Sequence, residues 1–207
     1  MYSSFKRFLD IVCALILLPI VLLLTIIVGF LIKMEDRGPI FYFAKRIGKD
    51  GNIFDMYKFR SMKVGAKDIR LEDGSTYNSD NDERVTKIGK LIRKTSIDEI
   101  PQLLNILKGD MTFIGPRPDS AMWLDNYTAE ERVILRVRPG ITGYNQAINR
   151  NAVGTKEKLR NDIIYVENMS LFFDIKILLM TFQTVMLSKN VNRKDDITNN
   201  SKVGKGS

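Results

Sequence analysis

The chain has 207 residues, enough for one domain with a real core, and carries a formal net charge of +8. It contains no histidine and a single cysteine, Cys13, which excludes imidazole catalysis, histidine zinc sites and an intramolecular disulfide. Acid–base or covalent chemistry must therefore use carboxylates, lysines, tyrosines or hydroxyls, and the positive charge indicates anionic partners such as phosphates, acidic lipid or nucleic acid.

The first feature along the chain is an uncharged apolar run over residues 11–32. As a straight helix it would reach about 33 Å, enough to span a bilayer. Basic residues stand on both sides of the run, and they favour the cytoplasmic side of a membrane. Pro19, inside the run, can break or kink a helix. A straight span and a re-entrant helix that bends at Pro19 both stay open, and the charge pattern favours the second.

Residues 40–60 predict a β-hairpin, because two aromatic-rich segments flank an Asp-Gly turn. Alternation along the second strand places Lys58 and Arg60 on one face. Two cations on one strand suit a phosphate, although an ordinary solvated strand face explains them equally well. Residues 64–84 are polar and acidic, which indicates a surface excursion without chemistry.

Residues 93–111 form the central stretch, with apolar side chains at helical spacing. Ser96 and Glu99 stand in capping-box relation, which predicts a helix starting near Ser96, and Gly109 ends it. Asp98 and Glu99 would then lie in a first turn, where the helix dipole favours anions and keeps a carboxylate ionised. The alternative is that the two acids only cap the helix.

The remaining elements follow in order. Two prolines flank Arg117 and predict a rigid loop that presents its guanidinium. Further elements are an amphipathic segment over 119–127, a capping box that opens a helix at 128–135, a cationic turn-rich segment at 136–143, and helices over 155–166 and 171–187. Asp174 lies in the first turn of the last helix, where dipole compensation is the usual reason for an acid.

Six cations of the soluble part stand near a turn or the end of an element: Lys58, Arg60, Arg93, Arg117, Arg138 and Arg150. The chain adds one adjacent pair of carboxylates. Several guanidinium groups are useful when a substrate carries more than one phosphate. One carboxylate of the pair could bind Mg²⁺, and the other could attack phosphorus. The residues themselves thus indicate phosphoryl-group chemistry at a membrane.

Three blocks, at residues 57–62, 93–118 and 137–143, resemble in sequence and order the signature of the bacterial sugar transferases, the monotopic phosphoglycosyl transferases. The resemblance covers about residues 5–187, and the length matches the minimal members of that family. Residues 146–151 read Gln-Ala-Ile-Asn-Arg-Asn and depart from the run that family members often carry there. If that loop touches nucleotide or sugar, the donor preference does not follow from the resemblance.

The resemblance implies a glycosyl-1-phosphate transferase that moves a phosphosugar from a UDP-sugar to polyprenyl (undecaprenyl) phosphate, releasing UMP by a ping-pong route. Asp98 would be the nucleophile, and Glu99 would hold the Mg²⁺ cofactor. It places the chain in the bacterial inner membrane, with its catalytic domain on the cytoplasmic face. This is the first membrane step of glycoconjugate assembly, such as exopolysaccharide or lipopolysaccharide, with downstream glycosyltransferases as further partners and no nucleic acid. Our candidate substrate-binding residues are Lys58, Arg60, Arg93, Arg117, Arg138, Gln146, Arg150 and Asp174.

The expected fold is α+β and mainly helical: a monotopic membrane protein with an N-terminal re-entrant helix, a β-hairpin and amphipathic interface helices. We divide it into a membrane helix at 1–34, a catalytic domain at 35–188 and a polar, disordered tail at 189–207. Two other functions stay open. One is a membrane-anchored basic protein that binds acidic lipid or nucleic acid without catalysis, and the other is a lipid phosphatase that works through an aspartyl-phosphate.

Overall fold

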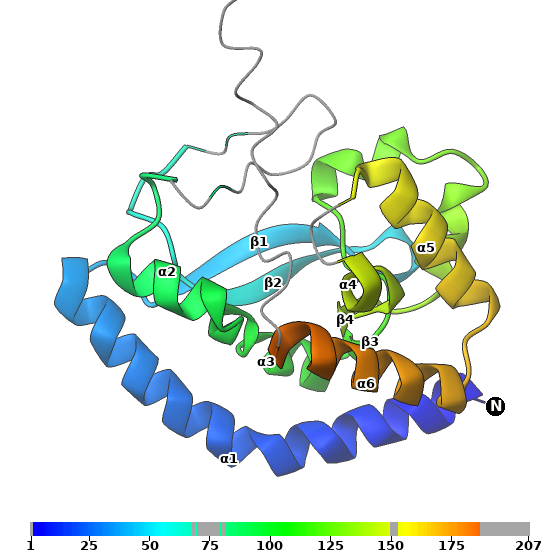
Figure 1. Ribbon diagram of the computed structural model, residues 1–207, viewed down its shortest axis with the longest axis horizontal. Helices are drawn as coiled ribbons and strands as arrows, with labels where there is room; N and C mark the ends of the chain where they lie inside the picture. The colour runs from blue at the N-terminus through cyan, green and yellow to red at the C-terminus, as the bar shows by residue number, and fades with distance from the viewer. Residues whose placement is uncertain (1, 68, 70–78, 80–81, 150–152, 187–207) are drawn as a thin grey trace, which may run out of the picture.

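The computed structural model of the chain describes residues 2–67, 69, 79, 82–149 and 153–186. A long N-terminal helix lies under a body built from short helices and two small sheets (Figure 1). The mainly helical α+β fold is confirmed. The elements are α1 (Tyr2–Asp36), β1 (Phe41–Ile47), η1 (Lys49–Gly51), β2 (Ile53–Phe59), α2 (Lys87–Lys94), η2 (Ile97–Glu99), α3 (Gln102–Lys108), β3 (Thr112–Ile114), η3 (Ala121–Asn126), η4 (Glu131–Arg136), β4 (Gly140–Thr142), α4 (Tyr144–Asn149), α5 (Thr155–Glu167) and α6 (Leu171–Met186), where η marks 3₁₀ helices.

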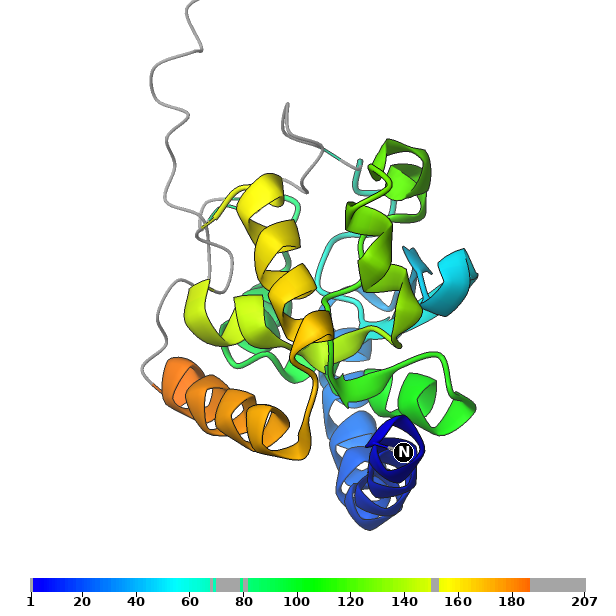
Figure 2. The same cartoon turned by 90° about the vertical axis from the view of Figure 1, so that its right-hand side faces the viewer.

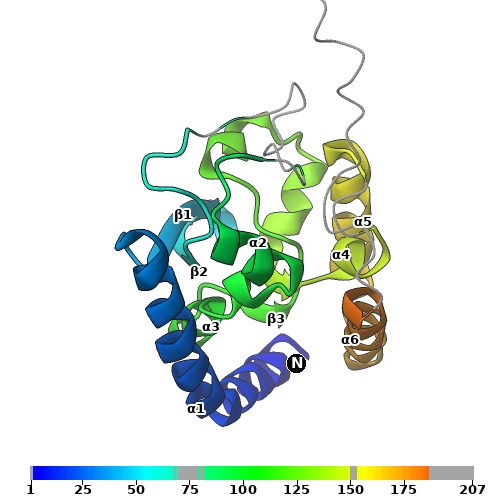
Figure 3. The same cartoon turned by 60° about the vertical axis from the view of Figure 1, so that its left-hand side comes forward.

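Helix α1 is one continuous helix of 35 residues with Pro19 inside it. By length and composition it is able to cross a membrane. It is bent near its middle, so that both legs turn toward the body (Figures 1 and 3). The missing N–H of a proline and the clash of its ring with the preceding turn explain such a bend.

Both ends of α1 are fastened to the same body. Near its start, Asp10 accepts a hydrogen bond of 2.7 Å from the hydroxyl of Thr112. At its other end, Glu35 accepts from two backbone N–H groups at the start of α2, and Asp36 forms an ion pair with Arg60. The apolar middle faces outward. Its exposed side chains are Leu15, Ile16, Leu17, Ile20, Leu22, Leu23, Ile26, Ile27, Phe30 and Leu31.

The predicted hairpin is confirmed: β1 and β2 pair antiparallel from Phe41 opposite Phe59 to Ile47 opposite Ile53. In its turn Asp50 and Gly51 adopt positive φ angles of 58° and 80°, which aspartate and glycine accept more readily than most residues. The buried face of the hairpin contributes to a core shared by α1 and α3. That core contains Ala14, Ala44, Met56, Leu103, Ile106 and Met111.

A second sheet, which the sequence did not predict, pairs β3 and β4 in parallel, with Thr112 opposite Gly140. A Cβ atom at Gly140 would lie 2.2 Å from the backbone nitrogen of Gly115, so only glycine allows this approach. The pairing brings two of the sequence blocks, the Arg117 loop and the 137–143 segment, side by side.

The helix expected to start near Ser96 begins later. Ser96 has a left-handed backbone (φ 58°), and its side chain does not cap the helix. A 3₁₀ turn, η2, follows, and α3 starts only at Gln102, because Pro101 lacks the N–H that a longer helix would need. The other capping box is formed, since Thr128 and Glu131 exchange both of its hydrogen bonds. It opens the 3₁₀ helix η4, however, and not an α-helix.

The predicted helices at 155–166 and 171–187 correspond to α5 and α6. Helix α6 lies at the same end of the molecule as α1 (Figure 2), and it also carries exposed apolar side chains, among them Phe172, Leu179 and Phe182. The predicted tail at 189–207 falls outside the described residues.

Candidate active site

The two adjacent acids, Asp98 and Glu99, lie in η2 within reach of cations from two other elements. The ammonium of Lys58, on β2, lies 2.7 Å from Oε1 of Glu99 and 3.9 Å from Oδ2 of Asp98. Arg117 donates from Nη1 to Oε2 of Glu99 at 3.3 Å, and its Nη2 donates to Oε1. Lys58 and Arg117 thus both bind the carboxylate of Glu99, and Asp98 lies beside them.

The Arg117 loop follows β3, and α5 supports it from behind. The ammonium of Lys158 donates to the backbone oxygen of Arg117 at 3.0 Å and to Oδ2 of Asp119 at 2.6 Å. Lys158 also lies 3.1 Å from a carboxylate oxygen of the buried Asp162. Sequence reasoning missed this support, because nothing in the local pattern of a helix shows which distant loop it holds.

The two acids have opposite electrostatic environments. Burial raises the pKa of Asp98, the charge of Glu99 adds to the rise, and Lys58 and Arg93 offset only part of it. Burial by itself would also raise the pKa of Glu99, but Arg117 and Lys58 outweigh it and hold that pKa well below its usual range. Glu99 is therefore a firmly ionised, neutralised group. The α-helical first turn expected at Asp98 is not formed, because Asp98 lies in a buried 3₁₀ turn, and burial is the largest influence on its pKa.

Arg93 completes this cluster from the last turn of α2. Its Nε donates to the hydroxyl of Ser61 at 2.8 Å, and its charge acts on Asp98. Lys58, Arg93 and Arg117, three of the candidate substrate-binding residues, thus converge on the carboxylate pair.

Arg60 lies elsewhere. Its Nη1 donates to Oδ2 of Asp36 at 2.6 Å and its Nε to the backbone oxygen of Pro39 at 2.6 Å. The side chain is 7% exposed, so these contacts give Arg60 a structural role in fastening the end of α1 to the hairpin.

Replacing Arg60 by glutamine should lower the free energy of unfolding by roughly 1–3 kcal/mol, because the buried guanidinium loses its ion pair with Asp36 and its hydrogen bonds to backbone oxygens. Thermal or denaturant unfolding in detergent measures this. Lys45→Gln is the matched control, because the Lys45–Asp55 pair is exposed and should contribute less than about 1 kcal/mol. A weaker affinity for a phosphate-bearing substrate at unchanged stability would instead support the substrate-binding role expected from the sequence.

Arg138 and Asp174 also have partners away from the acid pair. Arg138 donates from Nε to the backbone oxygen of Gly109 at 2.8 Å, at the opposite end of α3 from Glu99. Asp174 accepts from the hydroxyl of Tyr165 at 2.8 Å and pairs with Lys6 of α1.

Among the other candidates, Gln146 lies on α4, and its side-chain amide is buried without a hydrogen-bond partner among the described residues. The fully buried amide of Gln102, which sequence reasoning passed over, is in the same situation. Such groups are normally satisfied by a partner such as water or ligand, and Gln102 lies four positions after Asp98 in the chain. Arg150 lies outside the described residues.

Two adjacent carboxylates suit Mg²⁺, which binds one or two carboxylates and completes its shell with water and substrate phosphates. Within the described residues, no group of three or more acidic or cysteine side chains could form an all-protein metal site. Both oxygens of Glu99 already accept hydrogen bonds from Lys58 and Arg117. Asp98 and Glu99 therefore fit Mg²⁺ only when substrate phosphates are also bound, because those phosphates would take over the hydrogen bonds from Lys58 and Arg117.

Comparison with known proteins identifies the family of this chain. The model of the family described as bacterial sugar transferase matches residues 1–188. The chain is 38% identical over 191 residues to UDP-N-acetylgalactosamine-undecaprenyl-phosphate N-acetylgalactosaminephosphotransferase of Aeromonas hydrophila, covering 89% of this chain and 44% of that protein. It is 38% identical to undecaprenyl-phosphate galactose phosphotransferase of Salmonella typhimurium, over 87% of this chain and 40% of the relative.

A relative of similar length is the uncharacterized sugar transferase EpsL of Bacillus subtilis, which is 39% identical over 97% of this chain and 96% of its own length. By contrast, the chain spans less than half of the two larger relatives, so their full length includes parts that have no counterpart in it.

Proposed function

The chain belongs to the bacterial sugar transferase family, and from that membership we propose that it transfers a phosphosugar from a UDP-sugar to undecaprenyl phosphate. The products are a polyprenyl-diphosphate sugar and UMP. The observation that carries the proposal is the environment of Asp98, a buried carboxylate beside a neutralised acid and three converging cations. Burial destabilises the charged form of a carboxylate. The anion is therefore a stronger nucleophile when it meets a substrate phosphate.

We infer a two-step route through Asp98. A carboxylate oxygen of Asp98 attacks the β-phosphorus of the UDP-sugar. The bond between that phosphorus and the oxygen bridging to the α-phosphate breaks, and UMP leaves with the electron pair. An oxygen of the lipid phosphate then attacks the same phosphorus, and Asp98 leaves with the electrons of its own bond. The acid is regenerated, and the product is the diphosphate-linked lipid.

The neighbouring side chains have separate roles in this proposal. Lys58, Arg93 and Arg117 bind the negatively charged oxygens of the diphosphate and of the departing UMP. Glu99 holds Lys58 and Arg117 in place and, together with substrate phosphates, would hold Mg²⁺. When bound, that ion neutralises charge on the diphosphate.

For membrane association we propose a re-entrant α1 on the cytoplasmic side of the bacterial inner membrane. A straight helix of 35 residues would extend about 52 Å, and its ends would lie on opposite sides of a bilayer. Here both ends contact one body, through Asp10 and through Glu35 and Asp36. This body cannot lie on both faces of a bilayer, so the apolar middle dips in and returns, and α6 rests at the interface.

Cysteine labelling should find both ends of α1 on one side. In a Cys13→Ser background, Ser4→Cys and Met34→Cys place single thiols near the two ends, both at exposed positions. A membrane-impermeant maleimide should label both sites in inside-out vesicles and neither in sealed right-side-out vesicles. Labelling of the two sites from opposite sides would establish a straight span.

The reaction is tested with membranes that contain the full chain, Mg²⁺, undecaprenyl phosphate and a panel of UDP-sugars, with UMP release as the readout. UDP-N-acetylgalactosamine and UDP-galactose head the panel, because two relatives carry these sugars in their names. UMP released with one donor and lost with EDTA supports the proposal and names the sugar. Without the lipid acceptor, release of about one UMP per chain, and no more, would support the covalent first step.

The two other functions predict different results. A lipid phosphatase would release inorganic phosphate from the lipid without any nucleotide sugar. A basic anchor without catalysis would bind acidic vesicles, lose that binding steeply as salt rises, and be indifferent to the acid pair. Convergence of the cations on one carboxylate pair, instead of along a surface stripe, favours the transferase.

A further inference from the structure

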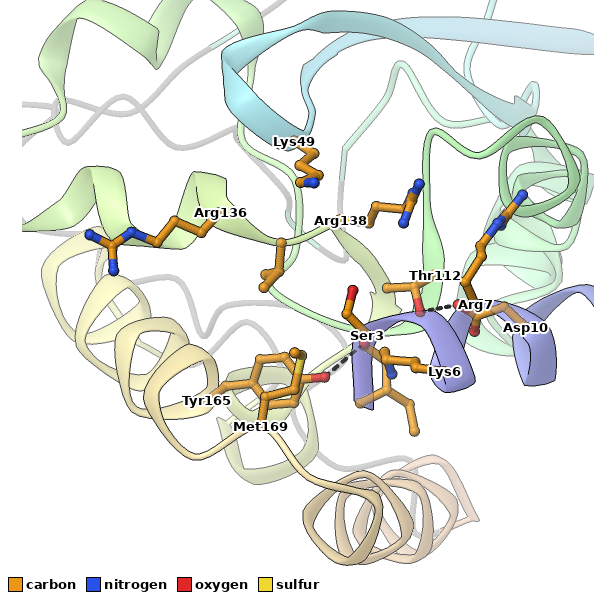
Figure 4. A pocket seen from close by; sticks show the side chains of 12 residues that line it. Ser3, Lys6, Arg7, Asp10, Lys49, Thr112, Arg136, Arg138, Tyr165 and Met169 are labelled. Carbon is orange, nitrogen blue, oxygen red and sulfur yellow. Dashed lines mark hydrogen bonds between the residues drawn. The ribbon is translucent and has the colours of Figure 1, made fainter. Parts of the chain in front are cut away.

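A second cationic pocket lies at the far end of α3 from the carboxylate pair. It opens between the start of α1, the hairpin turn and the segment before β4 (Figure 4). We call it the α3-end pocket. Its lining includes Ser3, Lys6, Arg7, Lys49, Thr112 and Arg138. Helix α3 has 7 residues, so the pocket lies on the order of 10 Å from the acids and is a separate site.

The two arginines of the α3-end pocket have a structural task in holding α3. Arg7 donates to the backbone oxygens of Ile106 at 2.6 Å and Leu107 at 3.2 Å, and Arg138 donates to Gly109. Carbonyl oxygens at a helix end attract cations in this way. This explains why both arginines are present, but backbone oxygens alone do not neutralise two full positive charges.

Positive charge in this pocket exceeds what its neighbours neutralise. A helix end supplies about half an elementary charge, whereas Arg7 and Arg138 bring two full charges that repel each other. Asp10 lines the pocket and offsets part of the charge of Arg7, and Asp50 lies 3.8 Å from Lys49. Asp174 pairs with Lys6, so the charge of Arg138 is the excess. In the described part of the chain neither arginine forms an ion pair.

Cationic and hydroxyl side chains surround a small gap. Lys49 reaches down from the hairpin turn, Arg7 and Arg138 stand beside each other, and the hydroxyl of Ser3 points in from α1 (Figure 4). The cavity has a volume of about 30 Å³, and one water needs about 10–15 Å³. It is therefore too small for a nucleotide, and its cationic lining suits a small anionic group.

The position of the pocket indicates where the phosphate comes from. Ser3 and Arg7 precede the uncharged run at 11–32 by only one or two turns. Met169, which also lines the pocket, stands two residues before α6 and its exposed apolar side chains. Both apolar helices thus begin at this pocket, which places it where lipid headgroups meet the protein.

We propose that the α3-end pocket binds the phosphate of an anionic membrane lipid, such as phosphatidylglycerol. This rests on the membrane association proposed above, but not on the transferase reaction. The lipid fastens the start of α1 to the end of α3, at one end of the helix that carries the catalytic acids at the other.

The test measures lipid that stays bound to the full chain after purification in mild detergent from vesicles of phosphatidylglycerol and phosphatidylcholine. The wild type should keep about one phosphatidylglycerol per chain by mass spectrometry. Lys49→Gln/Arg138→Gln should reduce retention at least tenfold, because each charged donor to a phosphate is worth roughly a factor of ten. Lys49→Gln, which changes an exposed side chain only, should reduce it severalfold and covers the case in which the double variant fails to fold.

Two controls make the result specific. Lys156→Gln/Arg160→Gln removes the same charge from exposed positions of α5 and should retain the lipid. Arg117→Gln, at the carboxylate pair, should also retain it. Equal lipid retention by wild type, Lys49→Gln and the double variant would refute the proposed lipid binding in the α3-end pocket. Binding of inorganic phosphate is measured by phosphorus NMR. If the double variant loses phosphate binding while its lipid retention is unchanged, the pocket binds free phosphate and the lipid proposal is refuted.

Flotation of each protein with the vesicles separates this proposal from the previous one. A wild-type chain that does not float would refute membrane association itself. A chain that floats but retains phosphatidylglycerol no better than phosphatidylcholine would refute only the lipid pocket.

Discussion

Asp98→Asn should abolish transfer, lowering UMP release at least about a thousandfold, because an amide has no anionic oxygen with which to attack phosphorus. Folding should be preserved, since the carboxylate is buried and burial opposes its charge, which an isosteric neutral amide does not carry. The measurement is steady-state UMP release, together with intact-protein mass spectrometry after incubation with donor alone. The wild type should gain the mass of a phosphosugar, and the variant should not.

Asp125→Asn is the matched control, because Asp125 is an exposed acid of η3 and should keep full activity. An Asp98→Asn enzyme with near-wild-type turnover would contradict the nucleophile assignment. A variant that turns over slowly but still gains the phosphosugar mass would move the attack to another residue, with Glu99 as the nearest one.

Arg117→Gln should lower turnover by a factor of about 10²–10⁴, in the range found when a charged group that stabilises a transition state is removed. Two effects add. The substrate phosphates lose a guanidinium donor. Glu99 loses one of its two cationic partners and keeps only Lys58. The pKa of Glu99 should then rise from its depressed value toward the usual range, so that activity declines at a higher pH on the acidic side than in the wild type.

Arg160→Gln, an exposed arginine of α5, is the charge-matched control for Arg117 and should behave as wild type. Arg117→Lys tests geometry, since a lysine keeps the charge but not the fork. Full activity of Arg117→Lys would show that only charge matters there. Full activity of Arg117→Gln would remove Arg117 from the site altogether.

Much of the molecule follows from local sequence patterns. The hairpin was predictable because strand alternation and an Asp-Gly turn are short-range signals, and the structure pairs β1 with β2 as expected. Helices α5 and α6 and the helix end at Gly109 were predictable for the same reason. The adjacent acids and the cations Lys58, Arg93 and Arg117 were also identified from the sequence, because residue types suited to phosphate stand near the ends of elements.

Local patterns failed where distant groups decide. The capping box at Ser96 did not form, since packing and Pro101 place a left-handed residue and a 3₁₀ turn there. Arg60 matched Lys58 in strand alternation, yet its partner is Asp36 at the end of α1. No periodicity shows which of two cations on one strand meets a substrate and which meets another helix.

By itself, therefore, the sequence determined the chemistry available to this protein: carboxylates and cations without histidine, an apolar helix with a proline, and the blocks of a sugar transferase. Only the tertiary structure decided how these are used. It made Asp98 and Glu99 unequal through burial and through the cations of β2 and the Arg117 loop. It also returned both ends of α1 to one body. The physical reason is that pKa values and ion pairs depend on distances in space, which separation along the chain does not set.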